Sequence, residues 1–415
     1  MMATVWHRTR AALADPEFRK LSVLITTAFI DMMGFAMVFP LLPFYALRLK
    51  ATPELIGAMT ASFSVAQLAS APFWGWVSDR RGRRPALLVG LTASAVAYVV
   101  FGFATSVWVL LASRLIQGAG GGTTGVVHAY VGDSIAPARR AQALGWLSAA
   151  TSLGVAIGPV IGSWSVRIGP AAPGLVAAGL CLTNVIFTWR WLPESRRPSP
   201  TPPDGVRRKP AVWSALWSVV ASPGKPVSRL VLIYGAGMLG FTAMTAVFAL
   251  FLGDRFKVDE MSIGPYFTYV GVLSFVMRAV VLGPVVRRIG EAGAMRLGTI
   301  SLVVGLAAYP FVPSIWVLLF VMPLIPVGTA LLFPATTALM SRASDQATLG
   351  VTMGVAQTFG GIARVAAPLI ATSAFQRFGS AMPFYLAAII VAGVGVLAFR
   401  LPEAVARPIE PQSTP

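Results

Sequence analysis

Long apolar stretches alternate with short polar connections along the whole chain. Each stretch holds about 20 residues or more, enough for a helix to cross roughly 30 Å of hydrocarbon. The pattern predicts twelve membrane-spanning helices, over residues 21–47, 55–77, 85–104, 107–131, 143–166, 171–192, 228–253, 262–286, 293–311, 314–340, 349–374 and 380–400. The first stretch is too long for a signal-peptide core and no small-residue cleavage site follows it, so we expect it to remain as a span.

Composition supports an all-α membrane protein. Of the 415 residues, 56% are hydrophobic and 12% are charged, whereas a water-soluble globular protein has about 25% charged residues. The single cysteine, Cys181, excludes an intramolecular disulfide. Because it lies within an apolar stretch, we expect it to be a packing residue.

The basic residues predict the orientation, because Lys and Arg near span ends collect on the cytoplasmic side. With a cytoplasmic N-terminus, 24 of the 33 Lys and Arg lie in the tails and inward loops and 6 lie in outward loops. Both termini are therefore predicted to be cytoplasmic. The net charge of +18 is spread over short loops without aromatic interleaving, so it indicates contacts with anionic lipid rather than with nucleic acid.

A polar segment in the middle divides the chain, because residues 193–227 carry eight prolines and a basic cluster. Trp213, Leu216, Trp217 and Val220 follow helical spacing there and predict a short interfacial helix within a cytoplasmic linker. The predicted domains are an N-terminal cytoplasmic segment, a six-helix bundle, the linker, a second six-helix bundle and a cytoplasmic tail, over residues 1–20, 21–192, 193–227, 228–400 and 401–415.

The two halves align when the sequence is shifted by about 208 to 209 residues. Gly75-x-x-x-Asp79 then falls on Gly283-x-x-x-Arg287, and Pro159 falls on Pro368. A constant offset between matching spans indicates a duplicated six-helix unit. Transporters built from two parallel repeats have this organisation, with the substrate site between the repeats at the midplane.

Four motifs and one further stretch of span 1 fit this pattern of spans. The stretch Gly75-x-x-x-Asp79-Arg80-x-Gly82-Arg83-Arg84 lies between spans 2 and 3 and resembles the loop signature of the major facilitator superfamily. The resemblance continues in Arg114-x-x-Gln117-Gly118 and in Asp133 followed by Arg139-Arg140. Gly154-x-x-x-Gly158-Pro159-x-x-Gly162 in span 5 is similar to the signature of its drug:proton antiporters, and IDMMGFAMVFPLLPFYA in span 1 resembles the branch of tetracycline and multidrug exporters.

The resemblance implies that the loop is a latch at the inner gate, made by Gly75, Asp79, Arg80, Gly82, Arg83 and Asp133. Asp79 is expected to face the N-terminus of span 11, near residues 349–353, where free N–H groups favour an anion. Arg83 is expected to pair with Asp133. The alternative is that the arginines only fix topology, and Arg287 at the Asp79 position makes a second, symmetric latch doubtful.

The resemblance also implies that span 5 seals the central cavity against leak, through Gly154, Gly158, Pro159 and Gly162. The simpler interpretation is close helix packing, because small residues four apart let helices approach. In span 10, Pro323, Pro326 and Pro334 predict an interrupted or bent helix.

Charges inside spans cost about 2.5–3.5 kcal/mol each on insertion scales, so each one is a functional hypothesis. Asp31 is the one acid that lies deep within a predicted span. It shares a helix face with Thr27 and Phe35, and Gly34 leaves room beside it. A dry site favours the neutral carboxyl and water or a cation favours the anion, so Asp31 is predicted to carry a proton. The alternative is a permanent ion pair.

Span 4 presents a polar stripe of Arg114, Gln117, Gly121, Thr124 and His128. The resemblance assigns Arg114 a role in proton exchange. His128 is either a second proton carrier or a structural group. Arg278 and Arg364 either bind an anionic group of the substrate or anchor helix packing.

The remaining residues predicted to line a substrate cavity are Thr27, Phe35, Gln117, Tyr234, Met238, Phe241, Gln357 and Arg364. Methionine and aromatic groups suit large lipophilic compounds, although ordinary helix packing uses them as well. The chain has no phosphate-binding Gly-rich loop followed by Lys-Ser/Thr, and its two histidines and one cysteine lie far apart. We therefore expect no ATP, no metal and no cofactor.

The sequence thus predicts a proton-coupled exporter of amphipathic drugs, a monomer in a bacterial inner membrane whose partners are a lipophilic small molecule, protons and lipid. One alternative is a transporter of an endogenous metabolite such as a sugar or siderophore. Another is a transport-inactive receptor. An intramembrane enzyme is disfavoured, because no second acid accompanies Asp31 and no nucleophile–base pair is evident.

Overall fold

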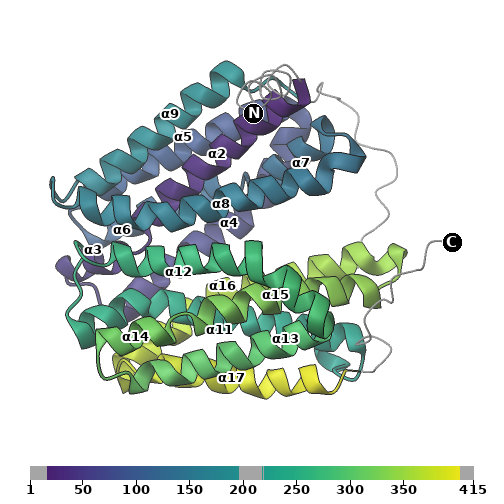
Figure 1. The fold of residues 1–415 in the computed structure, drawn as a ribbon. Helices are drawn as coiled ribbons and strands as arrows, with labels where there is room; N and C mark the ends of the chain where they lie inside the picture. The colour runs from purple at the N-terminus through teal and green to yellow at the C-terminus, as the bar shows by residue number, and fades with distance from the viewer. Residues whose placement is uncertain (1–15, 196–216, 218, 402–415) are drawn as a thin grey trace, which may run out of the picture. The chain divides into compact units, whose positions relative to one another are not determined.

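The computed structural model describes residues 16–195, 217 and 219–401, and within them the chain is nearly all helical and has no strand (Figure 1). Nine segments of these residues are long and apolar enough to cross a membrane, with the run Gly264–Phe311 counted as one. The predicted all-helical membrane fold is therefore confirmed. The count of twelve crossings and the cytoplasmic termini stay predictions. The predicted interfacial helix lies mostly outside the described residues. Of the two predicted end segments, only residues 16–20 and 401 are described.

The described helices divide into two compact units. Unit 1 comprises described residues up to Ala51, from Ser62 to residue 195, and Asp259–Gly271. Its helices are α2 (Pro16–Val38), α3 (Leu42–Arg48), most of α4 (Pro53–Arg81), α5 (Arg83–Gly102), α6 (Val107–Gly121), α7 (Thr124–Ser134), α8 (Pro137–Ser165), α9 (Ala172–Trp191) and the start of α12 (Gly264–Val276). Figure 1 shows α2, α5, α8 and α9 running alongside one another, and α2 packs on both α8 and α9.

Unit 2 comprises Thr52–Ala61, the described residues from 217 to Val258, and Val272 to residue 401. Its helices are α11 (Pro226–Phe256), the π-helical turn η1 (Met277–Val281), α13 (Leu282–Ala308), the 3₁₀ turn η2 (Tyr309–Phe311), α14 (Ile315–Val321), α15 (Leu324–Ala343), α16 (Gln346–Phe378) and α17 (Met382–Phe399). The close pairs are α13 with α15, α11 with α16, and α11 with α17.

The predicted duplication has counterparts in the geometry. Ser106 caps α6 by accepting a hydrogen bond from Val109 N, and Ser314, 208 positions later, caps α14 by accepting one from Val317 N. Likewise, a Cβ on Gly264 would lie 2.5 Å from the Pro159 carbonyl oxygen in unit 1. In unit 2, a Cβ on Gly57 would lie 2.8 Å from the carbonyl oxygen of Pro368.

Several predicted spans are built from more than one helix. Span 1 is α2 followed by α3, and span 10 is interrupted between Val321 and Leu324, as its prolines predict. Span 8 contains η1, and α13 bends at Gly290, which has a φ of 70° and a ψ of 172°. Only glycine adopts such a conformation at little cost. Sequence periodicity does not reveal the π turn, because the residues around it are apolar on nearly every side of the helix and a shift of register by one residue leaves no mark.

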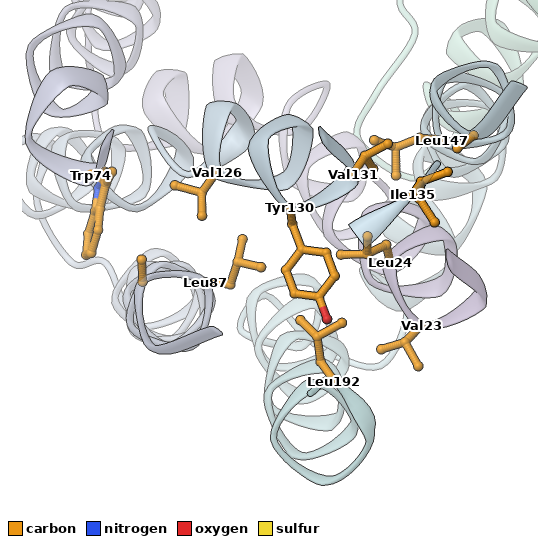
Figure 2. Packing of buried hydrophobic residues seen from close by; sticks show 12 residues of the cluster. Val23, Leu24, Trp74, Leu87, Val126, Tyr130, Val131, Ile135, Leu147 and Leu192 are labelled. Atoms are coloured by element: carbon orange, nitrogen blue, oxygen red, sulfur yellow. The ribbon is translucent and has the colours of Figure 1, made fainter. Parts of the chain in front are cut away.

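The core at one end of unit 1 is apolar and gathers five helices around Tyr130 (Figure 2). The ring lies among Leu24, Leu87 and Leu192, and its hydroxyl donates a hydrogen bond to the Pro193 carbonyl at 2.6 Å. Tyr130 is therefore both a packing residue and the anchor of the chain that leaves α9.

Candidate functional site

Asp31 lies in α2 with a side chain that remains partly accessible. One turn further along, a Cβ on Gly34 would lie 3.4 Å from Cε2 of Tyr98 in α5. The room that the sequence predicts beside Asp31 is thus taken by the ring of Tyr98. Asp31 lies close enough to interact electrostatically with that residue.

Tyr98 joins Asp31 to the polar residues of α6. The amide of Gln117 donates a hydrogen bond to the Tyr98 hydroxyl at 2.6 Å, and the Arg114 guanidinium also acts electrostatically on Tyr98. Arg114 and Gln117 are each 2% exposed. Tyr98 is therefore the neighbour that Asp31 and Arg114 share.

Arg114 lies in an apolar setting. Its guanidinium carbon is 5.3 Å from the centre of the Phe101 ring, and its Nε lies 3.4 Å from Ser113 Oγ. Among the described residues, Arg114 Nη2 and Gln117 Oε1 have no hydrogen-bond partner. A buried donor and a buried acceptor are therefore left available beside Tyr98, an arrangement that costs stability and is typical of functional positions.

Thr27, which is predicted to line the cavity, is buried against α9. It is 3% exposed, its hydroxyl lies 3.1 Å from that of Thr188, and its carbonyl accepts a hydrogen bond from Asn184 Nδ2 at 3.0 Å. Both partners belong to α9, so Thr27 holds two helices together. Phe35 is partly accessible and packs on Phe39 and Phe63 at centroid distances of 5.5 and 5.3 Å.

The predicted polar stripe of span 4 does not continue along one helix. The helix ends after Gly121, and α7 begins at Thr124. Arg114 and Gln117 are buried, whereas Thr124 and His128 are exposed. The imidazole of His128 makes no hydrogen bond with any described residue, so its role as a second proton carrier stays a prediction.

The glycines of α8 lie against the backbone of α2 on either side of Asp31. A Cβ on Gly154 would be 2.5 Å from the Phe29 carbonyl oxygen, and one on Gly158 would be 2.6 Å from that of Met33. Gly162 meets the backbone of Met37 in the same way. Helix α8 continues through Pro159 without a break. The motif therefore gives α2 and α8 direct backbone contact along the segment that carries Asp31.

Where α4 meets α5, Arg83 forms the ion pair with Asp133 of α7 that the resemblance implies. Arg83 Nε is 2.9 Å from Asp133 Oδ2, and Arg83 Nη1 is 2.8 Å from Asp79 Oδ1. The Arg83 side chain is 8% exposed and that of Asp79 is 54% exposed. Two other positions of this connection do not take part in the ion pairs. Gly82 has a φ of 103°, and the guanidinium of Arg80 stacks on the ring of Trp76.

Glu194 completes this loop and was not predicted. Its carboxylate accepts hydrogen bonds from the backbone N–H groups of Arg83 at 2.8 Å and Arg84 at 3.1 Å, which are the first two residues of α5. An anion at a helix N-terminus is stabilised by the free N–H groups and the dipole. Sequence spacing gave no signal for it, because 111 positions separate the partners.

In unit 2, the predicted cavity residues lie on α11 and α16. Tyr234 packs on Phe333 at 5.3 Å and faces Gly360, where a Cβ would lie 3.2 Å from its ring. Met238, Phe241 and Arg364 are partly accessible and Gln357 is exposed. A small apolar recess of this unit lies among Leu239, Ala367, Ile370 and their neighbours, and none of the predicted residues lines it.

The comparisons with known proteins agree with this architecture. The sequence profile of the Major Facilitator Superfamily matches residues 24–368 and 282–414. The chain is 28% identical over 354 residues to the class B tetracycline resistance protein of Escherichia coli, covering 85% of this chain and 86% of the relative. It is 27% identical over 373 residues to multidrug resistance protein 1 of Bacillus subtilis, covering 90% and 93%.

Solved structures support the fold. The human organic anion transporter MFSD10 superposes with a TM-score of 0.66 at 24% identity, over 92% of this chain and 99% of that one. A POT family transporter superposes with a TM-score of 0.76 at 15% identity, over 94% and 97%. The match to the profile covers most of the sequence, and the chain belongs to the major facilitator superfamily of membrane transporters.

Proposed function

We propose that the protein is a secondary active transporter that exports amphipathic, lipophilic compounds in exchange for protons by alternating access. The observation that carries the proposal is the placement of Asp31. This acid lies in an apolar helix, stays partly accessible, and neighbours the buried group of Tyr98, Gln117 and Arg114. Tetracycline and multidrug resistance proteins among the relatives support a drug as substrate.

In this proposal Asp31 binds one proton in each cycle. A substrate that favours the anionic carboxyl displaces the proton, and protonation in turn releases the substrate. Arg114 acts on the Asp31 carboxyl through its positive charge and through Tyr98, the neighbour that the two residues share. The protein works as a monomer in a bacterial inner membrane, needs no cofactor, and draws its energy from the proton gradient.

Proton movement in everted membrane vesicles tests the proposal. After respiration has acidified the lumen, adding a transported drug should release protons, and a pH-sensitive dye records the change. We expect responses to several unrelated lipophilic drugs. A response to one metabolite alone would identify a metabolite transporter, and vesicles that respond to nothing would contradict proton-coupled transport.

Replacing Asp79 with Asn should reduce transport, because it removes the charge that pairs with Arg83. The resemblance implies that the same charge faces the N-terminus of span 11, where free N–H groups favour an anion. We expect a cysteine placed at Gly350 to react faster with a membrane-impermeant thiol reagent applied from the inner side. The matched control is Arg81→Gln, an exposed change in the same loop. Unchanged transport together with unchanged labelling would refute the latch.

Tyr98→Phe should lower uphill export by roughly tenfold, since about 1–3 kcal/mol is the cost of leaving a buried polar group unpaired. The ring still packs on Gly34, but the Gln117 amide loses its acceptor. The control is Tyr45→Phe, which removes a hydroxyl that donates to the Pro170 carbonyl. If Tyr98→Phe and Tyr45→Phe lowered uphill export equally and left the proton-to-drug ratio unchanged, Tyr98 would have a packing role only.

A further inference from the structure

Arg278 lies near the middle of an apolar membrane segment, on the π-helical turn η1. It follows Gly264, the first residue of α12, by 14 positions and precedes the bend at Gly290 by 12. At about 1.5 Å per residue, each end of the segment is about 20 Å away. Neither end is near enough for the side chain to reach the membrane surface easily.

The π turn gives Arg278 an unusual backbone hydrogen-bonding pattern. The N–H of Leu282 donates to the carbonyl of Met277, five residues earlier, instead of four. Such single turns inside α-helices recur at functional sites, because they cost stability and reorient the side chains that they carry. None of the five residues of η1 is buried.

The Arg278 guanidinium is accessible and unsatisfied. Among the residues that the structure describes, no carboxylate, carbonyl or hydroxyl oxygen lies within hydrogen-bond distance of it, and its side chain is exposed. An exposed charge without a partner at this depth of the membrane is costly in hydrocarbon, so we expect the group to face water or a ligand rather than lipid.

Other arginines of the chain show what an anchoring role looks like. Arg296 Nε donates to the Ala398 carbonyl at 3.0 Å, and its guanidinium packs on the Phe399 ring at 5.8 Å. Arg342 pairs with Glu291 at 3.0 Å. Arg278 makes neither kind of contact within the described residues, so helix anchoring does not explain its position.

We propose that Arg278 binds an anionic group of the transported compound, a carboxylate or a sulfonate. Its planar fork of N–H donors matches the two oxygens of such a group, and a charge-assisted pair away from bulk water is strong. The inference rests on the proposed transport function and narrows its substrates to compounds that carry an acidic group, either alone or beside a basic one.

Three fluorescent probes with one chromophore test the proposal: dansylglycine is an anion, its methyl ester is neutral, and dansylcadaverine is a cation. Their fluorescence is titrated with the purified full-length protein in lipid nanodiscs. We expect Arg278→Gln to weaken dansylglycine binding by about 10-fold or more, the equivalent of one hydrogen bond to a charged group. Binding of the ester and of dansylcadaverine should change by less than about twofold.

Two further variants keep the test decisive. Arg278→Lys should recover part of the affinity for dansylglycine, because it restores the charge without the fork. Arg255→Gln, an exposed change at the end of α11, controls for the lost net charge. Equal dansylglycine affinity in the wild type and Arg278→Gln, or equal weakening of all three probes, would overturn the proposal.

The result of the Arg278 binding test can be told apart from the result of the test of proton-coupled transport. Vesicles that exchange drug for protons while Arg278→Gln binds dansylglycine normally would contradict this inference alone. An Arg278-dependent preference for the anion in a protein that moves no protons would contradict the proposed function and leave the binding site standing.

Discussion

Gly158→Leu should abolish coupled transport or produce an uncoupled proton leak. A leucine side chain at this position has no space, because its Cβ alone would lie 2.6 Å from the Met33 carbonyl oxygen and 2.8 Å from Ala36 Cβ. Two of the three nearest atoms belong to the α2 backbone, which cannot rotate away as a side chain can. Helix α2 or α8 must shift, and overpacking of this kind costs about 1–3 kcal/mol. The shift displaces the segment that carries Asp31.

Gly145→Leu is the matched control for this prediction. It introduces the same side chain into the same helix, at a glycine whose Cβ would meet nothing within 4 Å. Both variants are assayed for drug uptake and for dissipation of an imposed pH gradient in vesicles that contain equal amounts of protein. Tight, coupled transport in Gly158→Leu would leave the glycine motif with a packing role only.

Asp31→Asn should abolish uphill export while downhill movement of a neutral drug continues. Asparagine has almost the volume of aspartate, so the packing of α2 on α8 and of Gly34 on Tyr98 is kept, but the group can no longer exchange a proton. Uphill export is followed as drug accumulation in energised everted vesicles, and downhill movement as efflux from preloaded ones. Loss of both activities in a correctly inserted protein would assign Asp31 to binding or folding instead of coupling.

The same assignment predicts how the membrane potential acts. With one proton per cycle, a monovalent cationic drug exchanges without net charge movement, whereas a neutral drug moves one charge, worth about 2.3 kcal/mol per 100 mV. Export of the neutral drug should therefore fall when valinomycin and potassium collapse the potential. Export of the monovalent cation should respond to the pH gradient alone.

The sequence predicts the helical fold well, because apolar length and helix-breaking prolines are local signals. The interruption before Leu324 follows directly from Pro323. The break at Gly122 and Thr123 was missed, since glycines within an apolar stretch are equally compatible with a continuous helix. The segments 52–61 and 259–271 cluster with helices of the other sequence half, which no periodicity can reveal.

For the candidate site, the sequence identifies the charged groups but not their neighbours. Asp31 and Arg114 stand out because ionisable side chains are costly inside spans. Tyr98 and Glu194 do not: a tyrosine in an apolar span and an acid beside a proline-rich linker are ordinary, and their partners are remote in sequence. The α9 contacts of Thr27 were missed for the same reason, since a shared helix face does not indicate which neighbour covers it.

Counting protons against substrate in proteoliposomes tests whether Asp31 carries the coupled proton. Purified wild-type protein and Asp31→Asn are reconstituted at equal density, a neutral drug is added to one side, and the proton counterflow is read from an internal pH dye as the drug flux is measured. We expect one proton for each drug molecule in the wild type and drug flux without proton movement in Asp31→Asn. Proton counterflow of undiminished stoichiometry in Asp31→Asn would contradict the role of Asp31, because another group would then carry the proton.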